Sequence, residues 1–192
     1  MRSVVLKEHV QFCFQVLISR LNDTTPPQPT FPNDSYPLFV TWHKKTQNDD
    51  LQLRGCIGNF NPMPLQTGLS KYALISALED PRFPPITLSE IPLLTCAVSL
   101  LTDFEKAKDY LDWEVGTHGI WIEFIQTNGK RETATYLPEV MIEQNWTKKQ
   151  AIRSLLKKGN YTGEITENYC LNSIILTRYQ SQKLEEALSI TK

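Results

Sequence analysis

The residues best suited to chemistry lie in one short segment, Leu-Arg-Gly-Cys-Ile-Gly at positions 53–58. Arg54 carries a planar guanidinium that can hold a carboxylate or a phosphate through parallel hydrogen bonds. Cys56 can act as a nucleophile if a base or a positively charged neighbourhood lowers its pKa. Gly55 and Gly58 weaken a strand, so we expect them to permit a bulge, a positive φ, or close approach of a backbone or a ligand.

The same residue types also fit a purely structural interpretation. In that case Cys56 is a buried spacer, Arg54 forms a structural ion pair, and the two glycines bend a strand. Structural uses of such residues greatly outnumber reactive thiols, so the residue types alone favour this interpretation over catalysis.

Two further segments contribute candidate binding residues. Asp80 and Arg82, in a proline-rich turn, either contact a ligand or pair with each other or with Arg54. Trp113 and Glu114 border a possible pocket, with the indole as an apolar floor and the carboxylates of residues 112 and 114 facing Arg54. We place these residues second to the 53–58 segment.

Histidines offer one candidate base. His118, just before a predicted strand, can serve either as a base for Cys56 or as a turn histidine that bonds locally, and a lone histidine favours the local role. His9 and His43 have no partner at metal-ligand spacing. We therefore expect no metal site and no cofactor.

The overall charge is close to balanced, with a net charge of −1 and a pI near 6.3. No strong field exists to attract nucleic acid or an anionic membrane. The lysine- and arginine-rich stretch 148–158 is interpreted as a solvated helix face. No apolar run reaches the roughly 20 residues that span a bilayer. We expect a protein partner or a small molecule, and neither nucleic acid nor membrane.

The cysteines indicate a reducing compartment. Cys13, Cys96 and Cys170 sit inside apolar runs, where a thiol behaves as a small hydrophobe, and no C-x-x-C pair occurs. The apolar N-terminal stretch has the spacing of an amphipathic helix and lacks the features of a signal peptide. We expect a cytoplasmic location, with the nucleus as an additional compartment.

The positioning elements follow from apolar periodicity and from turn residues. Predicted helices span residues 3–21, 65–79, 138–145, 147–158 and 182–188. Predicted strands span residues 37–45, 51–60, 93–102, 119–124, 132–136 and 171–179. A proline-rich connector at residues 24–32 is expected to run over the surface. Residues 110–115 fit either a short helix or a loop.

Hairpins and helices are mixed without a regular β-α-β alternation. This order predicts an α+β fold, with a largely antiparallel sheet and flanking helices, in a single domain over residues 1–192.

The segment at 53–58 resembles the LRGCIG motif of the AMMECR-one family, and the resemblance extends over nearly the whole chain. Further matching segments, in the order of the family, lie at residues 36–42, 76–78, 80–85, 98–102, 110–116, 118–120, 133–140 and 176–179. One departure is Asn59, where the eukaryotic motif usually continues with threonine. The resemblance implies an α+β fold of two unequal lobes, with the motif in the sheet region.

The resemblance carries no established reaction, although prokaryotic fusions to Memo-like and radical-SAM proteins associate the family with redox or metal-linked chemistry. Two functions stay open. The first is an interaction or ligand-binding module centred on residues 53–58. The second is a thiol enzyme, with Cys56 as nucleophile, Arg54 as anion anchor, and Gly55 and Gly58 allowing close approach. The absence of a convincing base favours the module.

Overall fold

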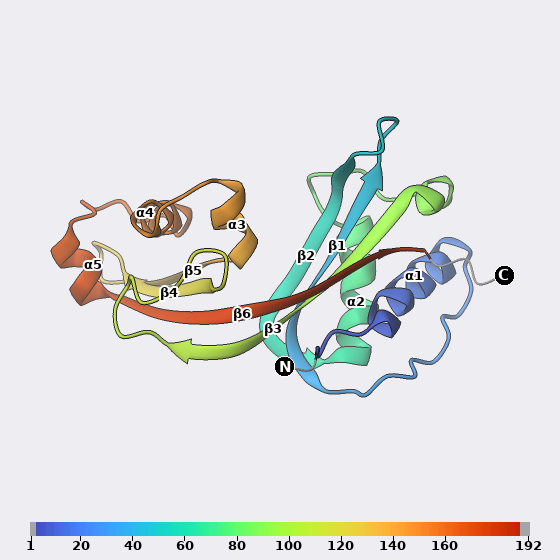
Figure 1. The fold of residues 1–192 in the computed structure, drawn as a ribbon, viewed down its shortest axis with the longest axis horizontal. Coiled ribbons are helices and arrows are strands. Elements are labelled where there is room, and N and C mark those ends of the chain that lie inside the picture. Colours follow the sequence, from blue (N-terminus) through green and yellow to red (C-terminus); the bar gives the residue numbers. More distant parts are fainter. Residues whose placement is uncertain (1–2, 189–192) are drawn as a thin grey trace. The chain divides into compact units, whose positions relative to one another are not determined.

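The computed structural model describes residues 3–188, and the chain forms two compact units. Unit 1 comprises Met1–Leu101 and Gln182–Lys192, and unit 2 comprises Thr102–Ser181 (Figure 1). The sequence predicted an α+β fold of two unequal lobes, and this prediction is confirmed. Two strands, β3 (Leu94–Lys106) and β6 (Ile174–Ala187), contribute residues to both units.

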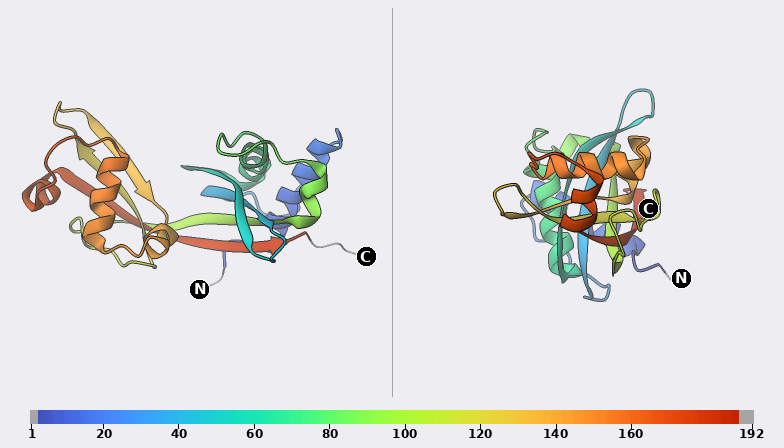
Figure 2. Two further views of the ribbon diagram at one scale, coloured as in Figure 1. Left: turned by 90° about the horizontal axis from the view of Figure 1, so that it is seen from above. Right: turned by 90° about the vertical axis from the view of Figure 1, so that its left-hand side faces the viewer.

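Unit 1 places two helices on one side of an antiparallel sheet. Strand β1 pairs with both β2 and β3, and the last part of β6 neighbours β3. Figure 2 shows both helices on the same side of these strands. The elements that lie entirely in unit 1 are α1 (Lys7–Leu21), β1 (Ser35–Lys45), β2 (Leu51–Pro64), α2 (Leu65–Leu78) and the 3-10 helix η1 (Leu88–Leu93).

Alternation along β1 separates the two faces of this sheet. Leu38, Val40 and Trp42 are fully buried against the helices, where the Trp42 indole N–H donates to the Ala73 carbonyl at 3.2 Å. Because successive strand residues point to opposite faces, Thr41 points away from α1 and α2. We call this opposite side the outer face of unit 1. Its β1 residues are Phe39, Thr41 and His43.

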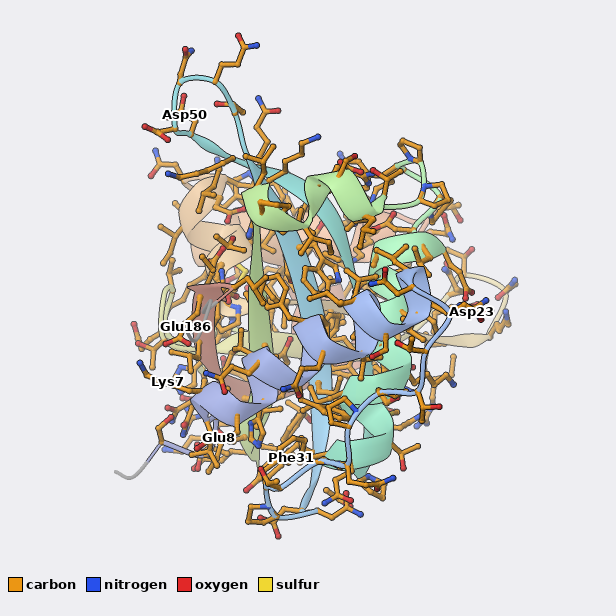
Figure 3. The ribbon with its side chains drawn as sticks, turned by 90° about the vertical axis from the view of Figure 1, so that its right-hand side faces the viewer. Lys7, Glu8, Asp23, Phe31, Asp50 and Glu186 are labelled. Carbon is orange, nitrogen blue, oxygen red and sulfur yellow. The ribbon has the colours of Figure 1, made fainter. Side chains whose placement is uncertain are left out.

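Contacts from the end of the connector and from the residues just beyond it define the start of α2, and within the connector the Phe31 carbonyl accepts the Gln66 side-chain amide at 2.9 Å. The connector leaves α1 at Asp23 and returns along the helices to Phe31 (Figure 3). Beyond it, Asn33 accepts the backbone N–H of Gln66 through its side chain at 2.9 Å, and the Asp34 carbonyl accepts the N–H of Leu65 at 2.9 Å. First-turn amides that would otherwise lack partners are thereby satisfied. The connector thus helps to hold α2 in place and does not separate domains.

Unit 2 builds a second, independent core. Strand β4 (Gly119–Ile125) pairs antiparallel with β5 (Arg131–Tyr136) and with β6. The predicted Asn-Gly turn is present, with φ of 82° at Gly129. The predicted capping box starts α4 (Lys148–Lys158), which contacts β5 and contributes its apolar side to the core of unit 2. Two short helices complete the unit, α3 (Pro138–Glu143) and α5 (Glu167–Ser173).

Three predicted elements were wrong in position or type. Residues 182–188 were predicted to form a helix, but residues 182–187 continue strand β6. The local sequence favours helix, yet pairing beside β3 and burial of Leu184 against the core override that propensity. Helix α1 begins at Lys7 and not at residue 3. Helix α5 replaces the start of a predicted strand, because Thr166 accepts the N–H of Tyr169 as a helix cap.

Several strand ends also differ from expectation. Strand β2 continues past residue 60 to Pro64, which an edge strand tolerates because prolines need no ladder partner there. Strand β3 extends to Lys106, and residues 110–115 form turns. In the described chain, no helix combines the length and the apolar character needed to cross a membrane.

The first prediction concerns His9, which is buried and accepts the N–H of Leu6 on Nδ1 at 3.2 Å. Burial lowers the pKa of His9 below its usual 6.5, so the folded state holds the neutral ring. The unfolded state therefore binds more protons, and stability should fall as the pH drops below 6.5.

Thermal unfolding of the wild type and of His9→Gln between pH 7.5 and 5 measures this effect. The midpoint of the wild type should fall more steeply with decreasing pH than that of the variant. Parallel pH profiles would contradict a neutral, buried His9.

Candidate functional site

Strand β2 carries the 53–58 motif, and its pairing with β1 is interrupted at Arg54. Trp42 lies opposite Gly55, whereas His43 lies opposite Leu53, so Arg54 is an extra residue on β2. This is a β-bulge, one of the geometries that the two glycines predicted. At the bulge, Arg54 has no partner residue on β1, and the alternation of side chains between the two faces of the sheet is interrupted within the motif.

Both glycines of the motif are required by close contacts within the protein. A Cβ on Gly55 would stand 2.0 Å from the carbonyl oxygen of Ser76 in α2. A Cβ on Gly58 would stand 2.3 Å from both the Leu38 carbonyl oxygen and the Phe39 ring. Neither glycine has a positive φ. The glycines therefore admit a helix backbone and an aromatic ring at van der Waals distance.

The Arg54 guanidinium is largely taken up by internal partners. Its Nε donates to Glu90 at 3.0 Å and its Nη2 donates to the second Glu90 oxygen at 3.2 Å, a bidentate pair. Nη1 and Nη2 also donate to the carbonyls of Pro84 and Pro85 at 2.7 and 3.3 Å. Only 11% of the side chain is exposed. Arg54 thus joins β2 to the loop before η1.

Glu90 receives a second cation in the same cluster. Lys44 donates to Glu90 at 2.9 Å, and the N–H of Thr87 donates to its other oxygen at 2.9 Å. Burial opposes ionisation of Glu90, but the hydrogen bonds from Arg54 and Lys44 lower its pKa to about 2. The carboxylate is charged across the neutral range, and it balances Arg54.

Asp80 and Arg82 pair with each other and bind the backbone of Cys56. The buried Asp80 carboxylate accepts the Cys56 N–H at 2.9 Å, and Arg82 donates to the Cys56 carbonyl at 3.2 Å. Arg82 also donates to Asp80 at 2.7 and 3.0 Å. These bonds hold the pKa of Asp80 well below its usual range. One carboxylate and one guanidinium therefore take the places of a neighbouring strand's C=O and N–H.

The Cys56 thiol lies on the outer face of unit 1. The Thr41 hydroxyl donates to its sulfur at 3.1 Å across the β1–β2 pair. Burial raises the pKa of Cys56, and this effect outweighs the opposing influence of Thr41, Arg82 and Lys183. Cys56 is the one partly exposed cysteine, because Cys13, Cys96 and Cys170 are buried. Cys56 is partly exposed as a residue, and its thiol stays protonated at neutral pH.

Sequence reasoning missed a carboxylate–imidazole pair on the same face. His43 Nδ1 lies 2.7 Å from Glu185, which also accepts the Thr95 hydroxyl at 2.9 Å. The hydrogen bond with His43 is the main cause that lowers the pKa of Glu185 to about 2. Strand alternation in β1 places His43 on the face of Thr41. Glu185 could not be found, because its segment was interpreted as a helix.

The other predicted site residues lie in unit 2 and have local partners. Trp113 is buried in the core of unit 2, and its indole N–H donates to the Tyr110 carbonyl at 3.1 Å. His118 Nδ1 accepts the N–H of Glu114 at 2.9 Å, which is the local role expected of a turn histidine.

The carboxylates of residues 112 and 114 were predicted to face Arg54, and this was wrong. Asp112 accepts from Arg178 at 3.0 Å, and Glu114 pairs with Lys148 at 3.0 Å. Arg54 instead pairs with Glu90, a residue that no motif indicated.

Potential metal ligands do not cluster in the part of the chain that the structure describes. Over residues 3–188, no three His, Cys, Asp or Glu side chains come together in a geometry that could hold an ion. The polar groups around Cys56 can donate and accept hydrogen bonds, and they present one neutral thiol.

A family model described as AMMECR1 matches residues 10–184. The chain belongs to the AMMECR1 family. Uncharacterized protein At2g38710 of Arabidopsis thaliana is 52% identical over 177 residues, covering 91% of this chain and 82% of the relative. Uncharacterized protein C688.03c of Schizosaccharomyces pombe is 40% identical over 181 residues, covering 93% and 91%.

One more distant relative and one solved structure are also similar to this chain. Protein MJ0810 of Methanocaldococcus jannaschii is 32% identical over 161 residues, covering 80% of this chain and 75% of the relative. The crystal structure of an uncharacterized protein, PH0010 from Pyrococcus horikoshii, aligns with a TM-score of 0.72 and 24% identity. It covers 95% of this chain and 93% of that one. The family resemblance seen in the 53–58 motif is thus confirmed for almost the full length.

A second prediction follows from the contact at Gly55. Gly55→Ala should separate β2 from α2, because the new methyl meets a backbone carbonyl that cannot rotate away. Overpacking of this kind costs roughly 1–3 kcal/mol and occasionally more. Gly129→Ala is the matched control, since nothing lies within 4 Å of its Cβ position.

Urea unfolding of both variants measures the difference. The Gly129→Ala control should lose only about 1 kcal/mol of stability, because alanine is strained in the left-handed backbone conformation at this position. Equal losses for the two variants would show that Gly55 is not needed for close packing.

A third prediction uses Glu90, whose pKa of about 2 lies below the usual 4.5. Its contribution to stability is complete above pH 4.5 and is lost as the pH falls toward 2. The full loss is on the order of 3 kcal/mol, since each tenfold change in proton affinity is worth about 1.4 kcal/mol.

Glu90→Gln should remove this part of the pH dependence and lower stability at pH 7. Glu164→Gln, at an exposed position, is the control. Urea unfolding at pH 7, 4.5 and 3 gives the comparison. If the free energy of unfolding of Glu90→Gln fell with pH as steeply as that of the wild type, the assigned ion pair would be contradicted.

Proposed function

We propose that the protein is a binding module, which holds a protein partner on the outer face of unit 1 around Cys56. The observation that carries this proposal is the state of the Cys56 thiol. It is partly exposed, receives a hydrogen bond from Thr41, and has a pKa raised by burial. A protonated thiol is a poor nucleophile and a good neutral contact group.

The residues around the thiol have the composition of an interface. Phe39 and Phe60 pack edge to face, with ring centroids 5.2 Å apart, and both are partly exposed. The Arg82 side chain, which donates to the Cys56 carbonyl, is 54% exposed. Aromatic residues and arginine are enriched where protein partners bind, and they provide most of the binding energy.

The backbone groups of Cys56 at the edge of β2 are already hydrogen-bonded. This favours the outer face of unit 1 over the β2 edge as the binding surface. An added strand needs free N–H and C=O groups, but Asp80 and Arg82 occupy both groups of Cys56. A partner can still approach the side chains of the outer face. The site residues therefore have different roles: Arg54, Gly55, Gly58 and Asp80 position the strand, while Cys56 and Arg82 contact the partner.

A thiol enzyme is the second candidate, and one observation favours it. His43 lies on the same face as Cys56, and Glu185 orients its ring through Nδ1. This leaves Nε2 to accept a proton, as the base does in enzymes with an activated cysteine. No direct Cys56–His43 hydrogen bond is formed among the described residues, and catalytic hydrogen bonds often tighten only when substrate binds.

Alkylation with iodoacetamide distinguishes the two functions and provides a fourth prediction. For a binding module, Cys56 should react at pH 7 no faster than a free cysteine, and the rate should rise with pH beyond 9. His43→Ala should leave the rate unchanged. Mass spectrometry resolves the four cysteines, with the buried Cys13 and Cys96 as internal references.

Fast labelling at pH 7 that His43→Ala slows would overturn the binding module and support the enzyme. Partner capture then tests the face directly, with Cys56→Ser, Arg82→Gln and Phe39→Ala compared with Lys157→Gln on unit 2. Proteins retained by the wild type should be lost from the first three variants and kept by the last, provided that all four remain folded. An identical set for every variant would make the motif purely structural.

A further inference from the structure

A small cavity in unit 2 lies between α4 and the start of α5, apart from the residues discussed so far. Its volume is about 150 Å³. An apolar cavity of this size in a protein interior can hold a molecule as large as benzene. The cavity is thus too small for a peptide or a nucleotide, and large enough for a small organic molecule.

The floor of the cavity is apolar. Ile152 and Cys170 are buried at 1% and 5% exposure, and Ile165 is partly buried beside them. All three belong to the unit 2 core or pack against it. The floor is therefore held by the fold, as in ligand sites that are largely formed before binding.

The rim of the cavity carries an excess of positive charge. Lys149 and Glu167 form an ion pair at 3.4 Å, and the Tyr110 hydroxyl donates to the same Glu167 oxygen at 3.4 Å. Arg153 is exposed at the rim and has no hydrogen bond or ion pair to any residue between 3 and 188. Two cations and one carboxylate leave one positive charge, and it resides on an unpaired guanidinium.

The two cations stand close to the buried thiol. Burial raises the pKa of Cys170, while the charges of Arg153 and Lys149 act in the opposite direction. The Glu167 carboxylate adds to the rise, and the pKa of the buried thiol stays raised. Ligand sites commonly combine an apolar wall with a few convergent polar groups and a titratable group of shifted pKa.

We infer that this cavity binds a small carboxylic acid with a compact apolar body, its carboxylate on Arg153 and its body on Ile152, Ile165 and Cys170. A guanidinium matches a carboxylate with two parallel hydrogen bonds, which fixes the orientation of the acid. The apolar floor distinguishes such an acid from an inorganic anion. This site is separate from the outer face of unit 1 and does not depend on the function proposed for it.

Titration with benzoate, followed by ¹H–¹⁵N NMR of the full chain, tests the inference and is the fifth prediction. The amides of Ile165, Thr166 and Cys170 should shift with benzoate concentration. Arg153→Gln should weaken benzoate about tenfold, the loss expected when a charge-assisted hydrogen bond is removed. Lys157→Gln is the matched control, an exposed cation on the same helix that does not line the cavity.

Two further probes identify what the site recognises. Benzamide, a neutral molecule of the same shape, should bind at least fivefold more weakly than benzoate, because it cannot use the charge of Arg153. Inorganic phosphate should also bind more weakly, because it makes no contact with the apolar floor.

Three results would each overturn the inference. They are equal affinity for benzamide and benzoate, equal or tighter affinity for phosphate, and unchanged benzoate affinity in Arg153→Gln. Since Arg153 is exposed, its replacement should leave the fold intact, and the NMR spectrum of the variant verifies this directly.

Discussion

A single buried carboxylate, that of Asp80, determines how the motif strand is held. It accepts the backbone N–H of Cys56 and pairs with Arg82, which in turn binds the Cys56 carbonyl. Strand β2 lies at the edge of the sheet, and its bulge would otherwise leave these backbone groups exposed. Burying a carboxylate is unfavourable unless it is paired and hydrogen-bonded, and Asp80 meets both conditions. The position of the Cys56 thiol depends on this arrangement.

Other residues of the motif support the same strand through different contacts. Gly55 lets the carbonyl of Ser76 approach, and Arg54 ties the bulge to Glu90 and to the loop before η1. Residues with reactive side chains can thus recur in a family because the backbone requires them. Within the motif, Arg54 and Cys56 are both partly exposed, but the Arg54 guanidinium is already bonded to Glu90, Pro84 and Pro85. The groups that can contact another molecule therefore lie mainly on the outer face of unit 1 around the motif.

The α+β class, most elements and the bulge were predictable from local patterns. The capping box at Thr147 and the Asn-Gly turn at Gly129 are signals within a few residues, and they need no tertiary information. The pairing of Arg54 with Glu90 joins residues 36 apart, and any of several acidic residues fitted equally well. The strand at residues 182–187 has helical propensity, so only its place beside β3 decides its structure. Consequently Glu185, and with it the His43 pair, could not be found from the sequence.

The order of the units along the chain affects how the protein folds. Unit 2 is one continuous segment, whereas unit 1 is interrupted by it and resumes at Gln182. During synthesis on the ribosome, unit 2 is complete before unit 1 receives its last strand segment. That segment supplies the Gln182 side chain to the N–H of Val4 and Glu186 to Lys7, as Figure 3 shows for the latter pair. The Lys7–Glu186 contact of α1 therefore forms only after residues 182–186 have emerged.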